Sequence, residues 1–207
     1  MTFESVGSII QWAGGLLAYA TLGILLYGVW RGTQHESGRT TGRAVSWLRS
    51  SWFYFASSAL YFGVCYLAWI PLPWQVSSQA RTWMLIVGSL LYFPGLIFVL
   101  AGRLTLGKYY FVSTGLGAQL FADHRLITSG PYAFVRHPMY TGVFLAAVGS
   151  LLLYFTWTTL FFVCFAPLTM VRAWREEKVL AAEFGEQWQE YRRRVPMFVP
   201  RLSKKGW

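Results

Sequence analysis

Long apolar stretches alternate with short polar segments along most of the chain, and this spacing sets the expected architecture. Stretches 9–30, 52–70 and 83–101 each have about the 20 residues that an α-helix needs to cross the hydrocarbon core of a bilayer. Pro71 and Pro73 close the second stretch, and Trp, Tyr or Arg at the edges is typical of interfacial anchoring. The pattern predicts three membrane-spanning helices in the first half of the chain.

The fourth apolar stretch, 139–174, is too long for one span. At a rise of 1.5 Å per residue a single helix would be about 54 Å long, against a hydrocarbon core of about 30 Å. The β-branched and aromatic run Phe155-Thr156-Trp157-Thr158 predicts a turn and therefore a helical hairpin. We expect an all-α, polytopic membrane protein with five transmembrane helices, built as one domain over 1–207, with three spans in 1–101 and the hairpin in 102–207.

The segment after the fifth span has a different pattern. Leu180, Phe184, Trp188 and Tyr191 follow one another at spacings of three and four, which predicts an amphipathic helix on the membrane surface. Gly185 and the two prolines of the ending "VPMFVP" indicate that the chain then turns back to cover another part of the molecule.

Composition and charge agree with this topology. The chain is 55% hydrophobic and 13% charged, which is too apolar for an ordinary soluble domain. With five spans, one face collects all but one of the 18 Lys and Arg residues, the exception being Arg81. The positive-inside rule places this face and the C-terminus in the cytoplasm and the N-terminus outside, in a bacterial inner membrane or the endoplasmic reticulum. The net charge of +10 thus follows from topology and contact with membrane lipids, and nucleic-acid binding is not expected.

Small residues recur on one face of the fourth span, at Gly142, Ala146 and Ser150. Residues four apart lie on the same side of a helix, and small side chains there allow two helices to approach closely in lipid. The spacing predicts a helix-packing seam and no direct chemical role.

The stretch "GPYAFVRHPMY", 130–140, gathers polar residues at the start of the fourth span. A turn at Gly130 and a proline in the first turn of the next helix place His137 at the helix entrance and Tyr140 one turn further on. Unpaired N–H groups at a helix start favour an anion, and Arg136 adds positive charge. Either a ligand carboxylate or phosphate, or merely phospholipid headgroups, can satisfy this pattern.

A second polar cluster, "VRAWREEKVL", lies at the end of the fifth span. Arg172 and Glu176 are four residues apart and therefore share a helix face. Glu176 and Glu177 point about 100° apart, so both reach one ligand only if it wraps around the helix.

Together these clusters form an ordered pattern, "GPYxxxRHPxYxG", then a hairpin, then "RxxxEE…FGxxxxxY…VPxFxP". It resembles the family of isoprenylcysteine carboxyl and phospholipid methyltransferases, which are integral membrane enzymes. The segments "LGKYYF" from Leu106 and "HRLITSG" from His124 also look like landmarks of this family. The resemblance covers about 102–201, nearly half of the chain, and the first two spans carry no such signature.

The resemblance implies binding of S-adenosylmethionine in a cytoplasmic pocket roofed by the tail. It also implies methyl transfer to a lipophilic or membrane-embedded acceptor: a prenylcysteine carboxylate, a phospholipid amine or a thiol. Arg172 and Glu176 would act in catalysis, and no metal is required. The cofactor-binding residues that it implies are Gly130, Tyr132, His137, Tyr140, Glu176 and Glu177.

Two alternatives remain open at this point. Sterol reductases, which use NADPH, resemble this C-terminal half but usually have Asn where Met139 stands, and the paired glutamates also argue against them. A non-catalytic membrane protein of the same fold is the other alternative. A metal carrier is disfavoured because the three histidines form no ligand cluster with Cys or Asp at the usual spacing.

Overall fold

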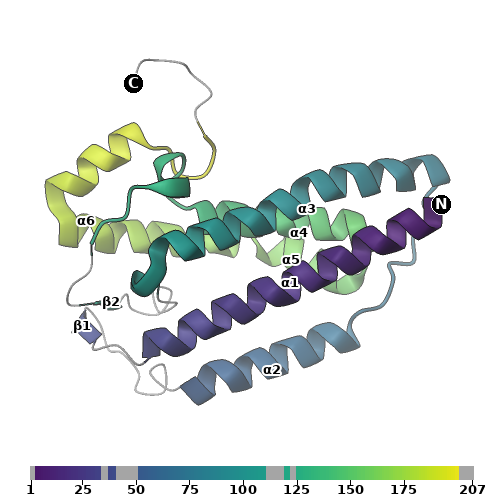
Figure 1. Ribbon diagram of the computed structural model, residues 1–207, viewed down its shortest axis with the longest axis horizontal. Helices are drawn as coiled ribbons and strands as arrows, with labels where there is room; N and C mark the ends of the chain where they lie inside the picture. The colour runs from purple at the N-terminus through teal and green to yellow at the C-terminus, as the bar shows by residue number, and fades with distance from the viewer. Residues whose placement is uncertain (1–2, 34–36, 41–50, 111–118, 122–124, 201–207) are drawn as a thin grey trace.

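The computed structural model describes residues 3–33, 37–40, 51–110, 119–121 and 125–200. Its helices run back and forth along the long axis of the molecule, with the N-terminus at one end and α6 at the other (Figure 1). The helical elements are α1 (Phe3–Thr33), α2 (Ser51–Leu67), α3 (Ser78–Leu106), η2 (Gly107–Tyr109), η4 (Gly130–Ala133), α4 (Pro138–Tyr154), α5 (Trp157–Phe165) and α6 (Leu168–Arg194).

Three helical regions within the described residues are long and apolar enough to cross a membrane: Glu4–Arg31, Ser78–Tyr109 and Trp157–Arg194. Two apolar helices, Phe55–Leu67 and Pro138–Tyr154, are shorter. A mainly helical integral membrane protein is therefore confirmed, whereas the count of five spans stays a prediction.

The turn between α4 and α5 lies where the sequence predicts it. Phe155 ends α4 in the left-handed region at φ 53°, and Thr156 begins α5 through a capping box with Thr159. The backbone of Phe155 accepts a hydrogen bond from the N–H of Leu72, and the N–H of Trp157 donates to Ile70. The predicted helical hairpin is thus confirmed, and the chain after α2 packs against its tip.

A short antiparallel pairing joins two loops that are distant in sequence. Strand β1 (Ser37–Thr40) pairs with β2 (Gln119–Phe121), so the α1–α2 and α3–α4 connections meet at the end of the molecule near α6 (Figure 1). The all-α prediction missed these strands because three or four residues are too few to show an alternating pattern. Their pairing agrees with the predicted common face for the first and third loops.

Helices α3 and α4 meet along a seam of small residues, as the spacing in α4 predicts. A Cβ atom added to Gly142 would lie 2.6 Å from the carbonyl oxygen of Gly95, and one added to Gly95 would lie 2.6 Å from the backbone nitrogen of Ala146. Ser150 is buried one turn further along. Backbone therefore packs directly on backbone, which is how helices associate closely in lipid.

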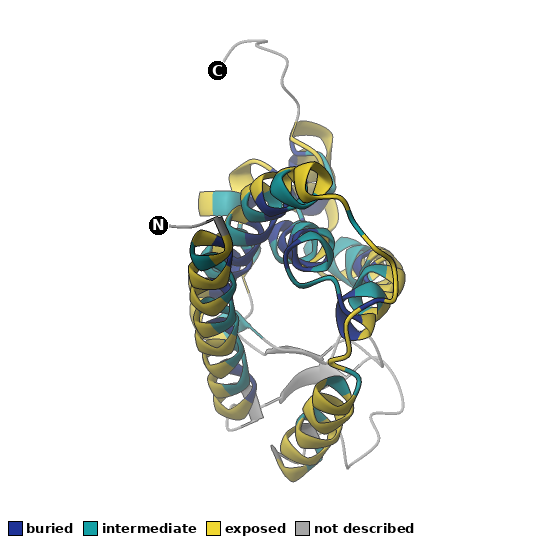
Figure 2. Cartoon of the chain, turned by 90° about the vertical axis from the view of Figure 1, so that its right-hand side faces the viewer, coloured by how far each residue is buried: buried dark blue, intermediate teal, exposed yellow. Residues whose placement is uncertain are grey.

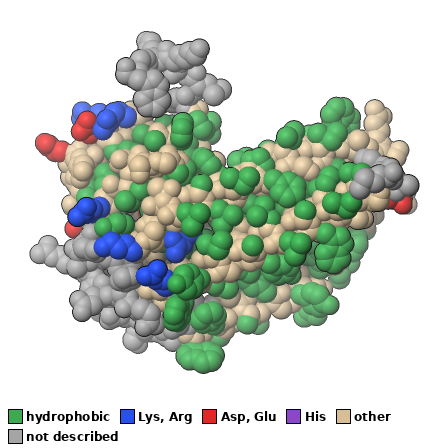
Figure 3. Space-filling view, viewed as in Figure 1, with side chains coloured by type: hydrophobic (Ala, Val, Ile, Leu, Met, Phe, Trp, Pro, Cys, Tyr) green, Lys and Arg blue, Asp and Glu red, His purple; other side chains and the backbone are tan. Residues whose placement is uncertain are grey.

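The outer surface is apolar over most of the molecule. Large hydrophobic side chains such as Trp12, Trp52 and Tyr66 are exposed, and α2 is exposed along most of its described length (Figure 2). Lys and Arg side chains on the face in Figure 3 gather at the end that holds α6. A bilayer would cover the apolar surface, and the basic end matches the charge asymmetry of the sequence.

Helix α6 combines two predicted elements. It begins at Leu168, inside the stretch up to residue 174 that predicts the fifth span, and continues to Arg194, with a break at Gly185, where φ is 49°. The apolar side chains beyond the break, Trp188, Tyr191 and Val195, form a buried cluster packed against Leu126 and the first part of α6. The predicted amphipathic helix therefore exists, but these side chains face the protein interior and not a lipid surface.

Candidate functional site

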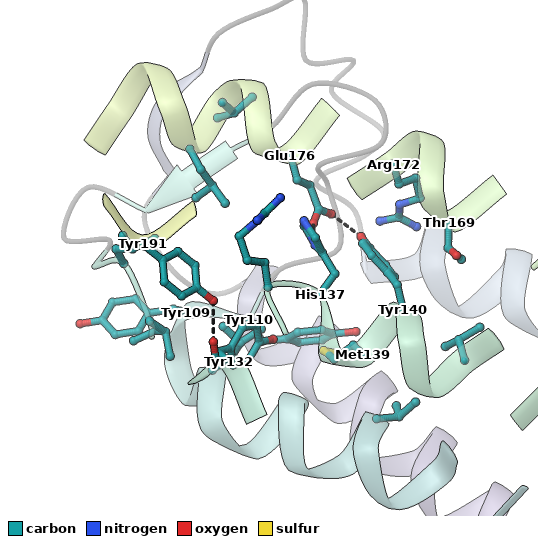
Figure 4. Close-up of a pocket in the computed structure, with 18 of the residues that line it drawn as sticks. Tyr109, Tyr110, Tyr132, His137, Met139, Tyr140, Thr169, Arg172, Glu176 and Tyr191 are labelled. Atoms are coloured by element: carbon teal, nitrogen blue, oxygen red, sulfur yellow. Dashed lines mark hydrogen bonds and ion pairs between the residues drawn. The ribbon is translucent and has the colours of Figure 1, made fainter. Parts of the chain in front are cut away.

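A cavity of about 320 Å³ lies between the end of α3, the start of α4 and α6. This volume is near the lower end of the range of about 300–1,000 Å³ found for small-molecule sites. Its polar wall includes Arg136 and the N-cap residue His137 just before α4, Tyr140 in the first turn of α4, and Arg172 and Glu176 from α6 (Figure 4). Four residues that the two sequence clusters predicted for the site thus meet around one space.

Tyr140 and Glu176 join α4 to α6. The hydroxyl of Tyr140 donates a hydrogen bond to the Glu176 carboxylate (Figure 4). The guanidinium carbon of Arg172 lies 6.0 Å from the centre of the same Tyr140 ring. The i, i+4 spacing of Arg172 and Glu176 therefore brings both side chains to the same tyrosine.

His137 lies between the two adjacent glutamates. Its Nδ1 is 3.7 Å from Oε2 of Glu176, and its Nε2 is 3.3 Å from Oε1 of Glu177. The residue is only 6% exposed, and its ring stacks on that of Tyr140 at 5.6 Å between centres. Two carboxylates that diverge along a helix therefore reach opposite sides of one imidazole, and the group they surround is the protein's own side chain.

Arg136 is paired with Glu177. Its Nε donates to Oε1 of Glu177 at 2.8 Å, and Nη2 lies 2.7 Å from the same oxygen. Burial raises the pKa of Glu177, but hydrogen bonds from His137 and Arg136 outweigh it, so that the pKa falls below its ordinary value of 4.5. The positive charge that the sequence suggested for a ligand anion instead holds a carboxylate of the protein.

The C-terminal segment covers the start of α4. The backbone N–H groups of Arg136 and His137 donate to the carbonyls of Pro196 and Met197, at 2.8 and 3.1 Å. The side chain of Phe198 packs on the ring of His137 with 5.8 Å between centres. The return of the chain that "VPMFVP" predicted therefore occurs, and it supplies acceptors to N–H groups at the helix entrance.

Tyr132 and Gly130 have different positions within η4. Tyr132 lines the cavity, and its carbonyl accepts a hydrogen bond from the hydroxyl of Tyr191 at 2.7 Å (Figure 4). Burial raises the pKa of Tyr132, which keeps its phenol neutral. Gly130 has a φ of 59°, and an added Cβ would lie 2.9 Å from Oγ1 of Thr105.

Two of the predicted cofactor-binding residues are outside the set of described residues that line the cavity. Gly130 shapes the turn before the site, and Glu177 faces Arg136 and His137. Their proposed role in binding is therefore indirect: Gly130 permits the turn that carries Tyr132, and Glu177 holds His137.

The cavity also contains residues to which the sequence analysis gave no role. Tyr109 and Tyr110, which follow α3, form part of its wall, as does Leu25 of α1. In the sequence, "LGKYYF" contributes only to the family resemblance, and Leu25 is one of many leucines in an apolar helix. Nothing in the local pattern distinguishes such a residue, because its position depends on how α1 packs against the rest of the protein.

These features define a helical integral membrane protein with a mixed polar and aromatic cavity at its basic end. Residues 81–182 match the sequence model of the isoprenylcysteine carboxyl methyltransferase (ICMT) family. The chain belongs to this family, which confirms the resemblance drawn from the motifs.

Three curated relatives show how far the similarity extends. The chain is 40% identical over 80 residues to Protein-S-isoprenylcysteine O-methyltransferase of Schizosaccharomyces pombe, covering 38% of this chain and 34% of the relative. It is 34% identical over 167 residues to Methanethiol S-methyltransferase 2 of Bradyrhizobium diazoefficiens, covering 72% and 59%. It is 36% identical over 83 residues to Cobalt-zinc-cadmium resistance protein CzcN of Cupriavidus metallidurans, covering 39% and 38%. The matches thus span about one third to three fifths of these relatives.

Proposed function

We propose that this protein is an integral membrane methyltransferase that uses S-adenosylmethionine and acts on a lipophilic or membrane-embedded acceptor. The observation that carries the proposal is the convergence of His137, Tyr140, Arg172 and Glu176 around one cavity. Membership of the ICMT family and the methyltransferase names of two relatives support it.

The donor and acceptor groups of the cavity fit this cofactor. S-adenosylmethionine has a carboxylate, an ammonium group, a ribose diol and an aromatic base, and a site for it needs both charges and an apolar slot. Arg172 supplies donors and Glu176 supplies acceptors, while Tyr110, Tyr132 and Trp188 provide aromatic walls. The bound cofactor would supply an already activated methyl group.

The protein's contribution to the reaction is mainly alignment. Methyl transfer requires the acceptor and the methyl carbon in line, and it is favoured when water is excluded. We assign Arg172 and Glu176 to orienting the acceptor, and His137 and Tyr140 to holding Glu176 in position through the contacts described above. The C-terminal segment helps to close the helix entrance to water.

The acceptor class follows from the walls and from the relatives. Leu25, Val99 and Val143 line the cavity from three apolar helices, which suits an acceptor with an apolar part. One relative is named for isoprenylcysteine and another for methanethiol, and the second matches more of this chain. We propose a thiol or a prenylcysteine carboxylate, with a phospholipid amine as a further candidate; a thiol or amine must lose its proton, whereas a carboxylate needs no base.

The proposed orientation follows the charge distribution. The basic end with the cavity and the C-terminus faces the cytoplasm, and the N-terminus lies outside. Reporter tags at the two termini test this arrangement, since they must report opposite sides of the membrane. Both tags on the same side would contradict five spans.

Calorimetry on the detergent-purified protein tests the cofactor. S-adenosylmethionine, S-adenosylhomocysteine and NADPH are titrated into the wild type, Glu176→Ala and Glu183→Ala. Glu183 lies on the same helix but is exposed, so its substitution is a matched control. Saturable binding of both S-adenosyl ligands to the wild type and Glu183→Ala, with loss in Glu176→Ala, is the expected result.

Other outcomes lead to the two alternatives. Binding of NADPH alone would indicate a reductase related to the sterol reductases. Absence of binding in a folded sample would favour a non-catalytic role, for which the similarity to CzcN, named as a resistance protein, is the supporting observation.

A further inference from the structure

A buried arginine lies at the end of α3, outside the wall of the cavity. Arg103 is 8% exposed, and its Nη1 donates a hydrogen bond of 3.0 Å to the carbonyl of Gly107, the residue that ends the helix. Its guanidinium carbon lies 4.4 Å above the centre of the Tyr110 ring. Arg103 thus holds both the backbone and the aromatic side chain of the segment that follows α3.

Helix α1 leaves room for this arginine at one position. A Cβ atom added to Gly28 would lie 2.3 Å from Nη2, 2.4 Å from Nε and 2.7 Å from Cζ of Arg103. Real Cβ atoms do not approach so closely, so any larger residue at Gly28 would displace the guanidinium group. Gly23, on the same helix, has no described atom within 4 Å of its added Cβ.

Tyr110 connects this contact to the site. Its ring lines the cavity beside Tyr132, across from Glu176 (Figure 4). A guanidinium plane stacks well on an aromatic face, and the attraction is stronger where water is excluded. The position of Arg103 therefore bears on the position of the cavity wall, although Arg103 itself lies outside the set of lining residues.

We propose that Gly28 and Arg103 form a relay through which α1 sets the position of Tyr110, and with it the shape of the ligand cavity. The identity of the ligand in this inference rests on the proposed methyltransferase function. The contacts among Gly28, Arg103 and Tyr110 do not depend on that function. Arg103 is a positioning residue in this relay. Helix α1, which lies outside the region matched by the family, would thereby influence which ligands the cavity accepts.

A double-mutant cycle tests the relay. Gly28→Ala, Arg103→Met and the double variant are compared for S-adenosylhomocysteine affinity by calorimetry, with Gly23→Ala as the matched control. We expect each single variant to weaken binding about 10-fold and the double variant to be no weaker than Arg103→Met, because both changes act through one contact. Gly23→Ala should bind like the wild type.

Hydrogen exchange provides a readout that needs no ligand. Exchange in peptides covering 104–110 should rise in Gly28→Ala and Arg103→Met, because the Gly107 carbonyl and the Tyr110 ring lose their partner, while α4 peptides remain unchanged. If Arg103→Met does not fold, Gly28→Ala still reports on the same contact.

Several results would overturn the relay. Multiplicative losses of affinity in the double variant would show that the two residues act separately. An equal effect of Gly23→Ala would indicate general packing of α1, and unchanged exchange in 104–110 would remove the structural link. If the wild type binds neither S-adenosyl ligand but exchange in 104–110 rises as expected, the proposed function fails and the relay stands.

Discussion

The two ends of α4 carry polar clusters that use their hydrogen bonds differently. At its C-terminal end, the side chains of Gln11 and Arg81 both donate to the carbonyl of Leu153, at 2.7 and 3.2 Å, and the hydroxyl of Tyr154 donates to the backbone of Gln11. At its N-terminal end, ionisable side chains from α4 and α6 pair with one another around a cavity.

The difference distinguishes a cluster that serves the fold from one that forms the proposed ligand site. The last carbonyls of a helix have no partner within the helix, so the donors near Leu153 satisfy backbone groups that folding itself leaves unpaired. In the cluster at His137, the side chains of Tyr140, His137 and Arg136 hold two carboxylates, and clustered ionisable groups at a cavity are typical of functional sites. Substitutions should therefore affect stability alone at one end, and both stability and ligand binding at the other.

The largest expected effect is on stability at the cavity end. Arg136→Met leaves the partly buried Glu177 carboxylate without its arginine partner, and breaking a fully buried pair of this kind costs about 3–5 kcal/mol, which is the upper limit expected here. Unfolding followed by denaturant titration in detergent measures the loss. Arg81→Met at the opposite end removes one hydrogen bond to a carbonyl and should cost about 1.5 kcal/mol. Equal losses for the two variants would contradict the distinction between the ends.

A pair of Tyr→Phe variants tests at which end of α4 a tyrosine hydroxyl contributes to ligand affinity. Tyr140→Phe removes the hydrogen bond to the Glu176 carboxylate, and a bond to a charged group contributes about 1.5–3 kcal/mol. S-adenosylhomocysteine affinity measured by calorimetry should fall about 10- to 100-fold. Tyr154→Phe makes the same chemical change at the other end and should bind like the wild type. A comparable loss in Tyr154→Phe would mean that the affinity reports overall stability.

Gln11→Leu tests the structural cluster alone. It removes one hydrogen bond to the Leu153 carbonyl, which Arg81 continues to satisfy, so the expected loss of unfolding free energy is about 1 kcal/mol. Ligand affinity should not change, because Gln11 of α1 contacts α4 at the end opposite to the cavity. A variant with normal stability but weakened binding would reverse the roles assigned to the two ends.

The smallest effect is the contribution of Glu177 to the pH dependence of stability. Because its pKa in the folded protein is below 4.5, Glu177 stabilises the fold above that pH, and this stabilisation is lost as the pH falls through the folded-state value. Thermal midpoints are compared as the pH is lowered from about 5. The midpoint of Glu177→Gln should fall less than that of the wild type over this range. Parallel curves for the two proteins would show that other carboxylates govern the acid response.

Much of the fold could be predicted because it depends on local pattern. The lengths of the apolar stretches placed α1, α2 and α3, and the run at Phe155 located the hairpin turn. The short β1–β2 pairing and the length of α6 were missed. Strand pairing between distant loops leaves no periodic signal, and an amphipathic pattern does not say whether its apolar face meets lipid or protein.

The sequence by itself was enough to predict the candidate site residues His137, Tyr140, Arg172 and Glu176, which stand at recognisable spacings along two segments. Only the tertiary structure decided that His137 lies between two glutamates that follow it by 39 and 40 positions, on the far side of the helical hairpin. The same holds for the contact between Gly28 of α1 and Arg103 of α3. Such contacts depend on how each helix is rotated and where the helices cross. Those quantities are set by packing between elements, and no single stretch of sequence records them.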